Sequence, residues 1–183
     1  MNEYLYQFKK LMNTRLEGYE MVRWRRKLTR KYSWAVPNEK ALQAITKYSP
    51  LIEIGAGTGF WAMLLKNRGV KIITYDLYPF KKNLYHNQIQ WFPIEKGTPL
   101  VLKNYLERNL FLCWPPYNDK MALECLKWFK GKIIIYIGEK KGGCNVIDKF
   151  FEVLEKDFKL VEEIKIPQWW DIHDCLTIWN RAN

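Results

Sequence analysis

Hydrophobic residues recur at helical spacing over the first thirty residues, which predicts one or two amphipathic helices there. The apolar positions are Leu5, Phe8, Met12, Leu16, Tyr19 and Val22. A second pattern begins at Pro37-Asn38-Glu39, a typical helix start, and continues over residues 40–47 until Pro50. We therefore expect residues 1–47 to form a helical extension that precedes the main domain.

From residue 48 onward, short apolar segments alternate with amphipathic ones. The pattern predicts strands at residues 51–54, 71–76, 109–114 and 132–137, a weaker strand at 88–92, and helices at 60–67, 100–108, 121–129 and 147–156. Two final strands, at 159–166 and 175–179, have no helix between them and predict an antiparallel edge hairpin. The fold class is thus α/β: residues 48–183 form one compact domain with a mostly parallel, Rossmann-like sheet covered on both faces.

Composition limits the remaining choices. A chain of 183 residues, 48% hydrophobic and 16% aromatic, fits one domain with a sizeable core and aromatic rings to spare for a pocket. No apolar run of about 18 residues and no signal-peptide core occur, so we expect a soluble, cytoplasmic protein without a membrane partner. Four cysteines without a CxxC pair predict reduced thiols, with no zinc site, other metal site or disulfide framework.

Positive charge is concentrated near the N-terminus. The formal net charge is +11, and residues 1–32 hold nine Lys or Arg against three Glu. The segment Arg23-Trp24-Arg25-Arg26-Lys27 could neutralise phosphates and stack a base, which makes nucleic acid a candidate partner. The same residues could equally form a solvated helix face, and the sequence leaves both interpretations open.

The segment Glu53-Ile54-Gly55-Ala56-Gly57-Thr58-Gly59 lies directly after a predicted strand and before a predicted helix. In an open α/β sheet, ligands bind at the carboxyl ends of strands, and glycines there let the backbone approach a ligand closely. A dinucleotide fingerprint would need its third glycine at Phe60, so a nucleotide-dependent oxidoreductase is disfavoured. The GxGxG pattern with a preceding acid instead resembles motif I of class I S-adenosylmethionine (SAM)-dependent methyltransferases.

This resemblance implies SAM as the cofactor and assigns roles around it. Asp76, at the end of the second strand, would hold the ribose diol, and Glu53 would help to anchor the methionine ammonium. Their alternative roles are a strand-end cap for Asp76 and a helix-dipole partner for Glu53. Trp34 precedes the first strand, where methyltransferases often close over SAM. The predicted cofactor-binding residues are Trp34, Glu53, Gly55, Ala56, Gly57, Gly59, Asp76 and Cys113.

The segment Cys113-Trp114-Pro115-Pro116-Tyr117 ends the fourth strand. It resembles the (Asp/Asn/Ser)-Pro-Pro-(Tyr/Phe) motif of amino-methyltransferases that act on adenine, cytosine or glutamine. There, backbone carbonyls and the polar first residue accept the protons of the amine, while the aromatic ring stacks on the target plane. Trp114 departs from this motif because an indole cannot accept a hydrogen bond. Asn118, Asp119 or a backbone carbonyl must then substitute, or Pro-Pro merely ends the strand.

A wider resemblance, over roughly residues 32–181, is to a widespread family of short methyltransferase-like proteins with a CWPPY motif. It rests on residues 32–37, the glycine loop, residues 113–118, 136–139 with 142–144, and 166–170 with His173 and Asp174. The resemblance supports the fold and the cofactor and supplies no substrate. His173, oriented by Asp171 or Asp174, is a candidate proton acceptor, and a loop hydrogen bond is its alternative role.

Together these features predict a SAM-dependent methyltransferase that acts on the nitrogen of a planar amine. The predicted catalytic residues are Trp114, Pro115, Pro116, Tyr117 and His173. A nucleic acid fits the basic N-terminal segment, and a small molecule or protein side chain fits the missing polar residue at position 114. The alternative function is a catalytically inactive binding module of the same fold, or a partner subunit.

Overall fold

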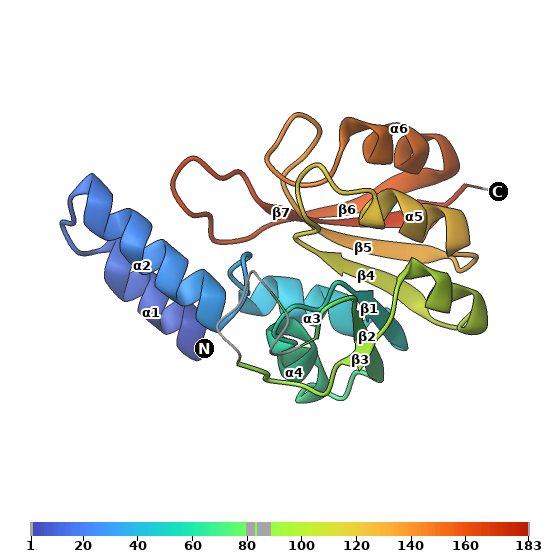
Figure 1. Cartoon of the computed structure of the whole chain (residues 1–183), viewed down its shortest axis with the longest axis horizontal. Helices are drawn as coiled ribbons and strands as arrows, with labels where there is room; N and C mark the ends of the chain where they lie inside the picture. Colours follow the sequence, from blue (N-terminus) through green and yellow to red (C-terminus); the bar gives the residue numbers. More distant parts are fainter. Residues whose placement is uncertain (1, 80–82, 84–88, 183) are drawn as a thin grey trace.

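One seven-stranded sheet, in the order β3-β2-β1-β4-β5-β7-β6, forms the centre of the computed structural model (Figure 1), which describes residues 2–79, 83 and 89–182. Its strands are β1 (Leu51–Ile54), β2 (Ile72–Asp76), β3 (Glu95–Lys96), β4 (Asn109–Cys113), β5 (Ile133–Gly138), β6 (Phe158–Lys165) and β7 (Cys175–Arg181). The helices are α1 (Glu3–Met12), α2 (Gly18–Lys31), α3 (Glu39–Thr46), α4 (Phe60–Lys66), α5 (Met121–Trp128) and α6 (Asp148–Asp157), with a 3-10 helix η2 (Pro99–Asn104).

The predicted fold class is confirmed. Strands β3, β2, β1, β4 and β5 run parallel, and β7 pairs antiparallel with both β5 and β6. β1 is buried along its whole length, as expected for a strand covered on both faces. Because β2 and β4 flank β1 on opposite sides, the strand order reverses at β1, and a ligand crevice is expected at its carboxyl end.

Two of the predicted elements differ in the structure. Gln88 lies outside the described residues, and residues 89–92 form no strand because the Trp91 amide donates to the Thr58 carbonyl instead of to a neighbouring strand. The strand beside β2 is β3, two residues long. The helix expected at residues 100–108 is the short η2, which ends where Tyr105 leaves helical geometry and its hydroxyl lies 2.7 Å from that of Tyr75.

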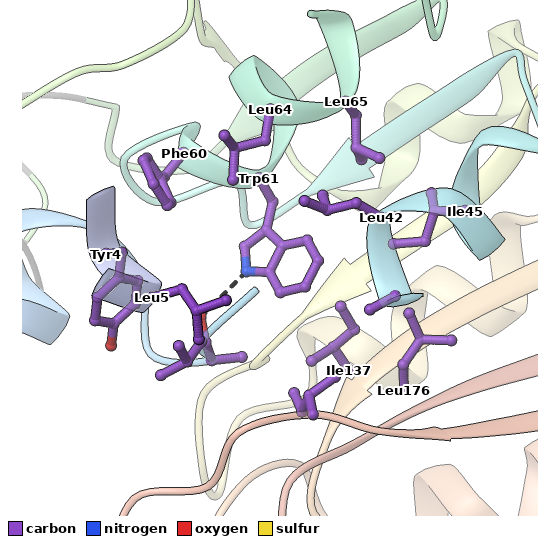
Figure 2. Packing of buried hydrophobic residues seen from close by; sticks show 14 of the residues in the cluster. Tyr4, Leu5, Leu42, Ile45, Phe60, Trp61, Leu64, Leu65, Ile137 and Leu176 are labelled. Carbon is purple, nitrogen blue, oxygen red and sulfur yellow. Dashed lines mark hydrogen bonds between the residues drawn. The ribbon is translucent and has the colours of Figure 1, made fainter. Parts of the chain in front are cut away.

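Hydrophobic clusters cover both faces of the sheet. Helices α1, α2, α3 and α4 contribute to one cluster, and α5, α6 and η2 contribute to the other. Figure 2 shows the first cluster around Trp61, whose ring lies among Leu42, Ile45 and Ile137. The Trp61 indole N–H donates to the Ala35 carbonyl at 3.3 Å, which satisfies its polar atom within the core. No described helix is long and apolar enough to cross a membrane.

The predicted helical extension consists of α1, α2 and α3. Asn38 caps α3 by accepting a hydrogen bond from the Ala41 amide at 2.8 Å, as the helix start at this point predicted. Helix α1 buries Tyr4 against the ring of Tyr32, which follows α2, at a centroid distance of 4.9 Å. Figure 1 shows α1 and α2 extending to one side of the sheet, with the end of α2 leading back toward it. The extension therefore shares one hydrophobic cluster with the domain that follows it.

Candidate functional site

The loop between β1 and α4 is shaped by glycines. Gly55, Gly57 and Gly59 have φ angles of +76°, +59° and +72°, values that other residues rarely adopt. A side chain at Gly55 would meet the Met121 methyl group at 2.8 Å, and one at Gly59 would meet the Phe92 Cβ at 2.8 Å. All three positions thus need glycine for the backbone conformation, and Gly59 also lacks room for a side chain beside the Phe92 backbone.

Asp76 ties the end of β2 to this loop. One carboxylate oxygen accepts a hydrogen bond from the Gly57 amide at 3.0 Å, and the other accepts one from the Tyr78 amide at 2.8 Å. Burial raises the pKa of Asp76, and these two amide hydrogen bonds oppose that rise. A carboxylate oxygen can accept more than one hydrogen bond, so the fixed carboxylate retains capacity for ligand hydroxyls.

Glu53 is a buried carboxyl group at the wall of the same site. Its side chain lies in β1, only 1% of the residue is exposed, and Oε2 has no hydrogen-bond partner in the described part of the chain. Burial, and then the negative charge of Asp76, raise the pKa of Glu53 well above its usual range. A carboxyl oxygen left without a partner in a pocket wall is best satisfied by a cationic or hydrogen-bonding ligand.

These groups line one cavity of about 830 Å³, within the range of small-molecule sites. Seven of the eight predicted cofactor residues line it, namely Trp34, Glu53, Gly55, Ala56, Gly57, Asp76 and Cys113. Of the five predicted catalytic residues, Trp114, Pro116 and Tyr117 line it. Gly59, Pro115 and His173 do not belong to the lining, since Gly59 caps α4 and Pro115 is buried behind the wall.

Two stacked indoles form part of the cavity wall. The rings of Trp34 and Trp114 lie 4.9 Å apart with an interplanar angle of 13°. Trp114 has a φ of +54°, an uncommon conformation for a bulky residue, and its indole N–H donates to the Asp174 Oδ1 at 2.7 Å. Asp174 is fully buried, its Oδ2 has no partner among the described residues, and burial raises its pKa to about 7.

The rest of the Pro-Pro segment leads to the mouth of the cavity. Tyr117 lines the cavity and is 67% exposed, so its ring is accessible to an incoming planar group. Asn118 has a φ of +56°, and the Asp119 carboxylate accepts a hydrogen bond from the Met121 amide at 2.6 Å. Asp119 thereby fixes the first turn of α5, while Asn118 and Asp119 both line the cavity.

His173 lies at the surface, beside Glu139. Its side chain is 81% exposed, and its amide donates to the Glu139 Oε1 at 2.8 Å. The other Glu139 oxygen accepts from the Cys144 amide at 2.7 Å, so Glu139 joins the loop after β5 to the loop between β6 and β7. The structure therefore places His173 in a loop hydrogen-bond network and not in the lining of the cavity.

Sequence patterns did not reveal two features near the cavity. The partner of the Asp174 carboxylate is Trp114, 60 residues away, and not His173. Arg25 of α2 places its guanidinium carbon 6.0 Å from the Trp34 ring centroid, and its Nε is buried without a hydrogen-bond partner in the described structure. Such contacts join distant segments, and no local spacing encodes them.

Comparison with solved structures supports the fold. The N-methyltransferase NodS from Bradyrhizobium japonicum WM9, in complex with S-adenosyl-L-homocysteine, is 13% identical, with a TM-score of 0.53 over 79% of this chain and 87% of that chain. Thermoplasma acidophilum 1320 is 13% identical, with a TM-score of 0.52 over 100% of this chain and 99% of that chain. A point mutant of MtNAS in complex with S-adenosylmethionine is 11% identical, with a TM-score of 0.55 over 98% of this chain and 72% of that chain.

No protein-family model and no curated protein sequence matches the chain. The resemblance to short proteins with a CWPPY motif therefore stays a prediction. At identities of 11–13%, the structural similarity establishes that the chain has the Rossmann-like fold of class I methyltransferases. Since one fold can host many activities, the function must be argued from the site itself.

Proposed function

We propose that this chain is a SAM-dependent methyltransferase that transfers a methyl group to the nitrogen of a planar, amine-bearing acceptor. The observation that carries the proposal is the buried Glu53 carboxyl group, which lines the cavity together with the glycine loop and Asp76. Its Oε2 has no hydrogen-bond partner among the described residues. A ligand with a cationic group and neighbouring hydroxyls complements these two carboxyl groups, and SAM has both. The solved structures of NodS and MtNAS, of the same fold, contain S-adenosyl-L-homocysteine and S-adenosylmethionine respectively.

The residues of the cavity fit this cofactor. Asp76 would accept hydrogen bonds from the ribose hydroxyls, and Glu53 would bind the methionine ammonium. The positive φ angles of Gly55 and Gly57 let the loop backbone approach the ligand without side-chain interference. Cys113 and Trp34 complete the wall of the site. When bound, SAM would supply an electrophilic methyl group on its sulfonium, with the neutral thioether S-adenosylhomocysteine as the leaving group.

The remaining lining residues are suited to a planar acceptor. Tyr117 and the indoles of Trp34 and Trp114 offer aromatic surface, and Pro116 restricts the backbone beside them. Orientation of the amine against the methyl group then supplies most of the rate, and no strong general base is needed. Backbone carbonyls of the Pro-Pro segment are the candidates for accepting the protons of the amine, because Trp114 has no acceptor atom.

Calorimetric titration with S-adenosylhomocysteine tests the cofactor site. We expect micromolar binding by the wild-type chain and binding weaker by on the order of 10- to 100-fold in Asp76→Ala, since hydrogen bonds to a charged group contribute about 1.5–3 kcal/mol. Glu155→Ala, a change at an exposed carboxylate of α6, is the matched control and should bind as wild type does. Absence of binding by the wild-type chain would contradict the proposal.

A second function is favoured by Trp114. Its indole N–H is already bonded to Asp174, and it replaces the residue that accepts the amine protons in the motif it resembles. The lack of an acceptor atom at this position is compatible with a binding module that keeps SAM without transferring its methyl group. Normal cofactor binding with no methyl transfer to RNA, DNA, peptides or small amines would favour this second function.

A further inference from the structure

Helix α2 presents a row of cations to solvent. Among its 14 residues are six Lys or Arg and a single acid, Glu20, which gives the helix a formal charge of +5. Arg23, Arg26 and Lys27 are exposed. Between them, Trp24 is 38% exposed, and the Lys27 ammonium lies 4.5 Å from its ring centroid. This surface combines charges that can contact phosphates with a ring on which a base can stack.

The cationic helix leads directly to the aromatic part of the cavity. Lys31 is the last residue of α2, and Ser33 and Trp34, two and three positions later, line the cavity. Arg25 faces the same ring of Trp34, with its buried Nε lacking a partner in the described part of the chain. Burial raises the pKa of Asp174, whose carboxylate accepts from the Trp114 indole, and the positive charge of Arg25 opposes that rise. Helix α2 therefore ends two residues before the ring-lined cavity begins.

We propose that the acceptor is a nucleobase in a single-stranded nucleic acid, whose phosphates lie along α2 while the base enters the cavity beside Trp34, Trp114 and Tyr117. This inference rests on the proposed methyltransferase function and names its substrate class. A helix of 14 residues is about 21 Å long, which is enough to lie beside several phosphates of one strand. A base within a duplex is stacked and paired, so a single strand presents its amine at lower cost.

Fluorescence anisotropy with labelled single-stranded oligonucleotides of about 12 nucleotides, RNA and DNA, tests this surface. The test variant is Arg23→Ala/Arg26→Ala/Lys27→Ala. Its matched control is Lys132→Ala/Lys156→Ala/Lys159→Ala, which removes the same charge from exposed positions near the start of β5, the end of α6 and the start of β6. The register pairs Ile133 and Lys159 with Asn180, so these lysines gather at the sheet end opposite the cavity.

We expect the affinity of wild type and control to fall steeply and equally with salt. The α2 variant should lose about two units of the slope of log K against log salt, since each phosphate contact contributes about 0.7 for single strands. Both variants should bind S-adenosylhomocysteine as wild type does, which separates this test from that of the cofactor site.

Three results would overturn the inference. The first is equal affinity and salt slope for the α2 variant and the control. The second is tighter binding to a duplex of the same sequence than to the single strand. The third is α2-dependent binding to vesicles of phosphatidylserine and phosphatidylcholine without binding to oligonucleotides, which would assign the helix to an anionic membrane surface. If S-adenosylhomocysteine binding persists in these cases, the proposed function stands without its nucleic-acid acceptor.

Discussion

Glu53 and Asp174 share an unusual condition: each is a buried carboxyl group with one oxygen that has no partner in the described residues. Burial raises the pKa of both groups, because the charged form loses its hydration. The protonated forms of Glu53 and Asp174 are therefore favoured more strongly than the protonated form of an exposed carboxyl group. Any ligand or condition that restores the charge must release a proton.

For Glu53, cofactor binding should release that proton. The ammonium group of S-adenosylhomocysteine favours the ionised carboxylate, so affinity should rise as pH increases through the raised pKa of Glu53. Titrations at several pH values between 5 and 8, each in two buffers of different ionisation enthalpy, should show a buffer-dependent binding enthalpy for wild type in the pH range where Glu53 is protonated before binding. Glu53→Gln should bind more weakly and lose this buffer dependence. Equal heats in both buffers for the wild-type chain would exclude proton release.

For Asp174, the raised pKa links stability to pH. Between the ordinary value of 3.8 and about 7, the native state holds a proton that the unfolded state has lost, so stability falls as pH rises through this window and levels off above it. Urea unfolding at pH 5 and pH 8 should show a loss of about 2–3 kcal/mol in wild type beyond that in Asp174→Asn. The amide oxygen of Asn can still accept the hydrogen bond from the Trp114 indole, so the variant removes the titrating group and keeps this contact.

Asp171→Asn is the control for Asp174→Asn. Asp171 belongs to the same loop, is exposed, and has a φ of +60° that asparagine tolerates. This variant should keep the pH dependence of wild type. If Asp174→Asn also keeps it, the carboxyl group of Asp174 does not carry the proton assigned to it.

At the scale of elements, the glycines that precede and follow α4 differ in the space around them. Gly59 before the helix has no room for a side chain because of Phe92, whereas Gly69 after it has a φ of +83° and open space around it. Gly59→Ala should therefore cost roughly 2–4 kcal/mol of unfolding free energy and weaken S-adenosylhomocysteine binding, and Gly69→Ala only about 1–2 kcal/mol with binding unchanged. Urea unfolding and calorimetry measure both effects. Equal costs would show that the loop adapts around Phe92.

The parts of the candidate site that are contiguous in the sequence could be predicted from it. Residues 51–59 and Asp76 carry their information locally, as a buried strand, a glycine loop and a strand-end acid, so the core of the candidate site was predicted. β3 was misplaced because its two exposed residues have no apolar pattern. The contacts of Trp114 with Trp34 and Asp174 join residues 60 or more positions apart, and only the fold brings them together.

At the scale of the whole molecule, the strand reversal at β1 and the helical extension meet at one place. The sheet supplies the glycine loop and the two acids, and the segment after α2 supplies Trp34 to the same cavity. Much of the net positive charge of the chain lies on the extension. Positive charge on the extension attracts anionic molecules at long range, which raises their concentration around this part of the molecule.

Helix α1 packs against the loop between β6 and β7. The Trp169 indole donates a hydrogen bond to the Tyr4 hydroxyl, and the Phe8 ring contacts the Trp169 ring. These partners are 165 residues apart, and a ribosome adding about 5–20 residues per second needs about 10–30 s to make the second after the first. During this interval the apolar face of α1 has no Trp169 to pack against. Correct folding of the nascent chain therefore depends on keeping α1 from aggregating until the loop between β6 and β7 has been made.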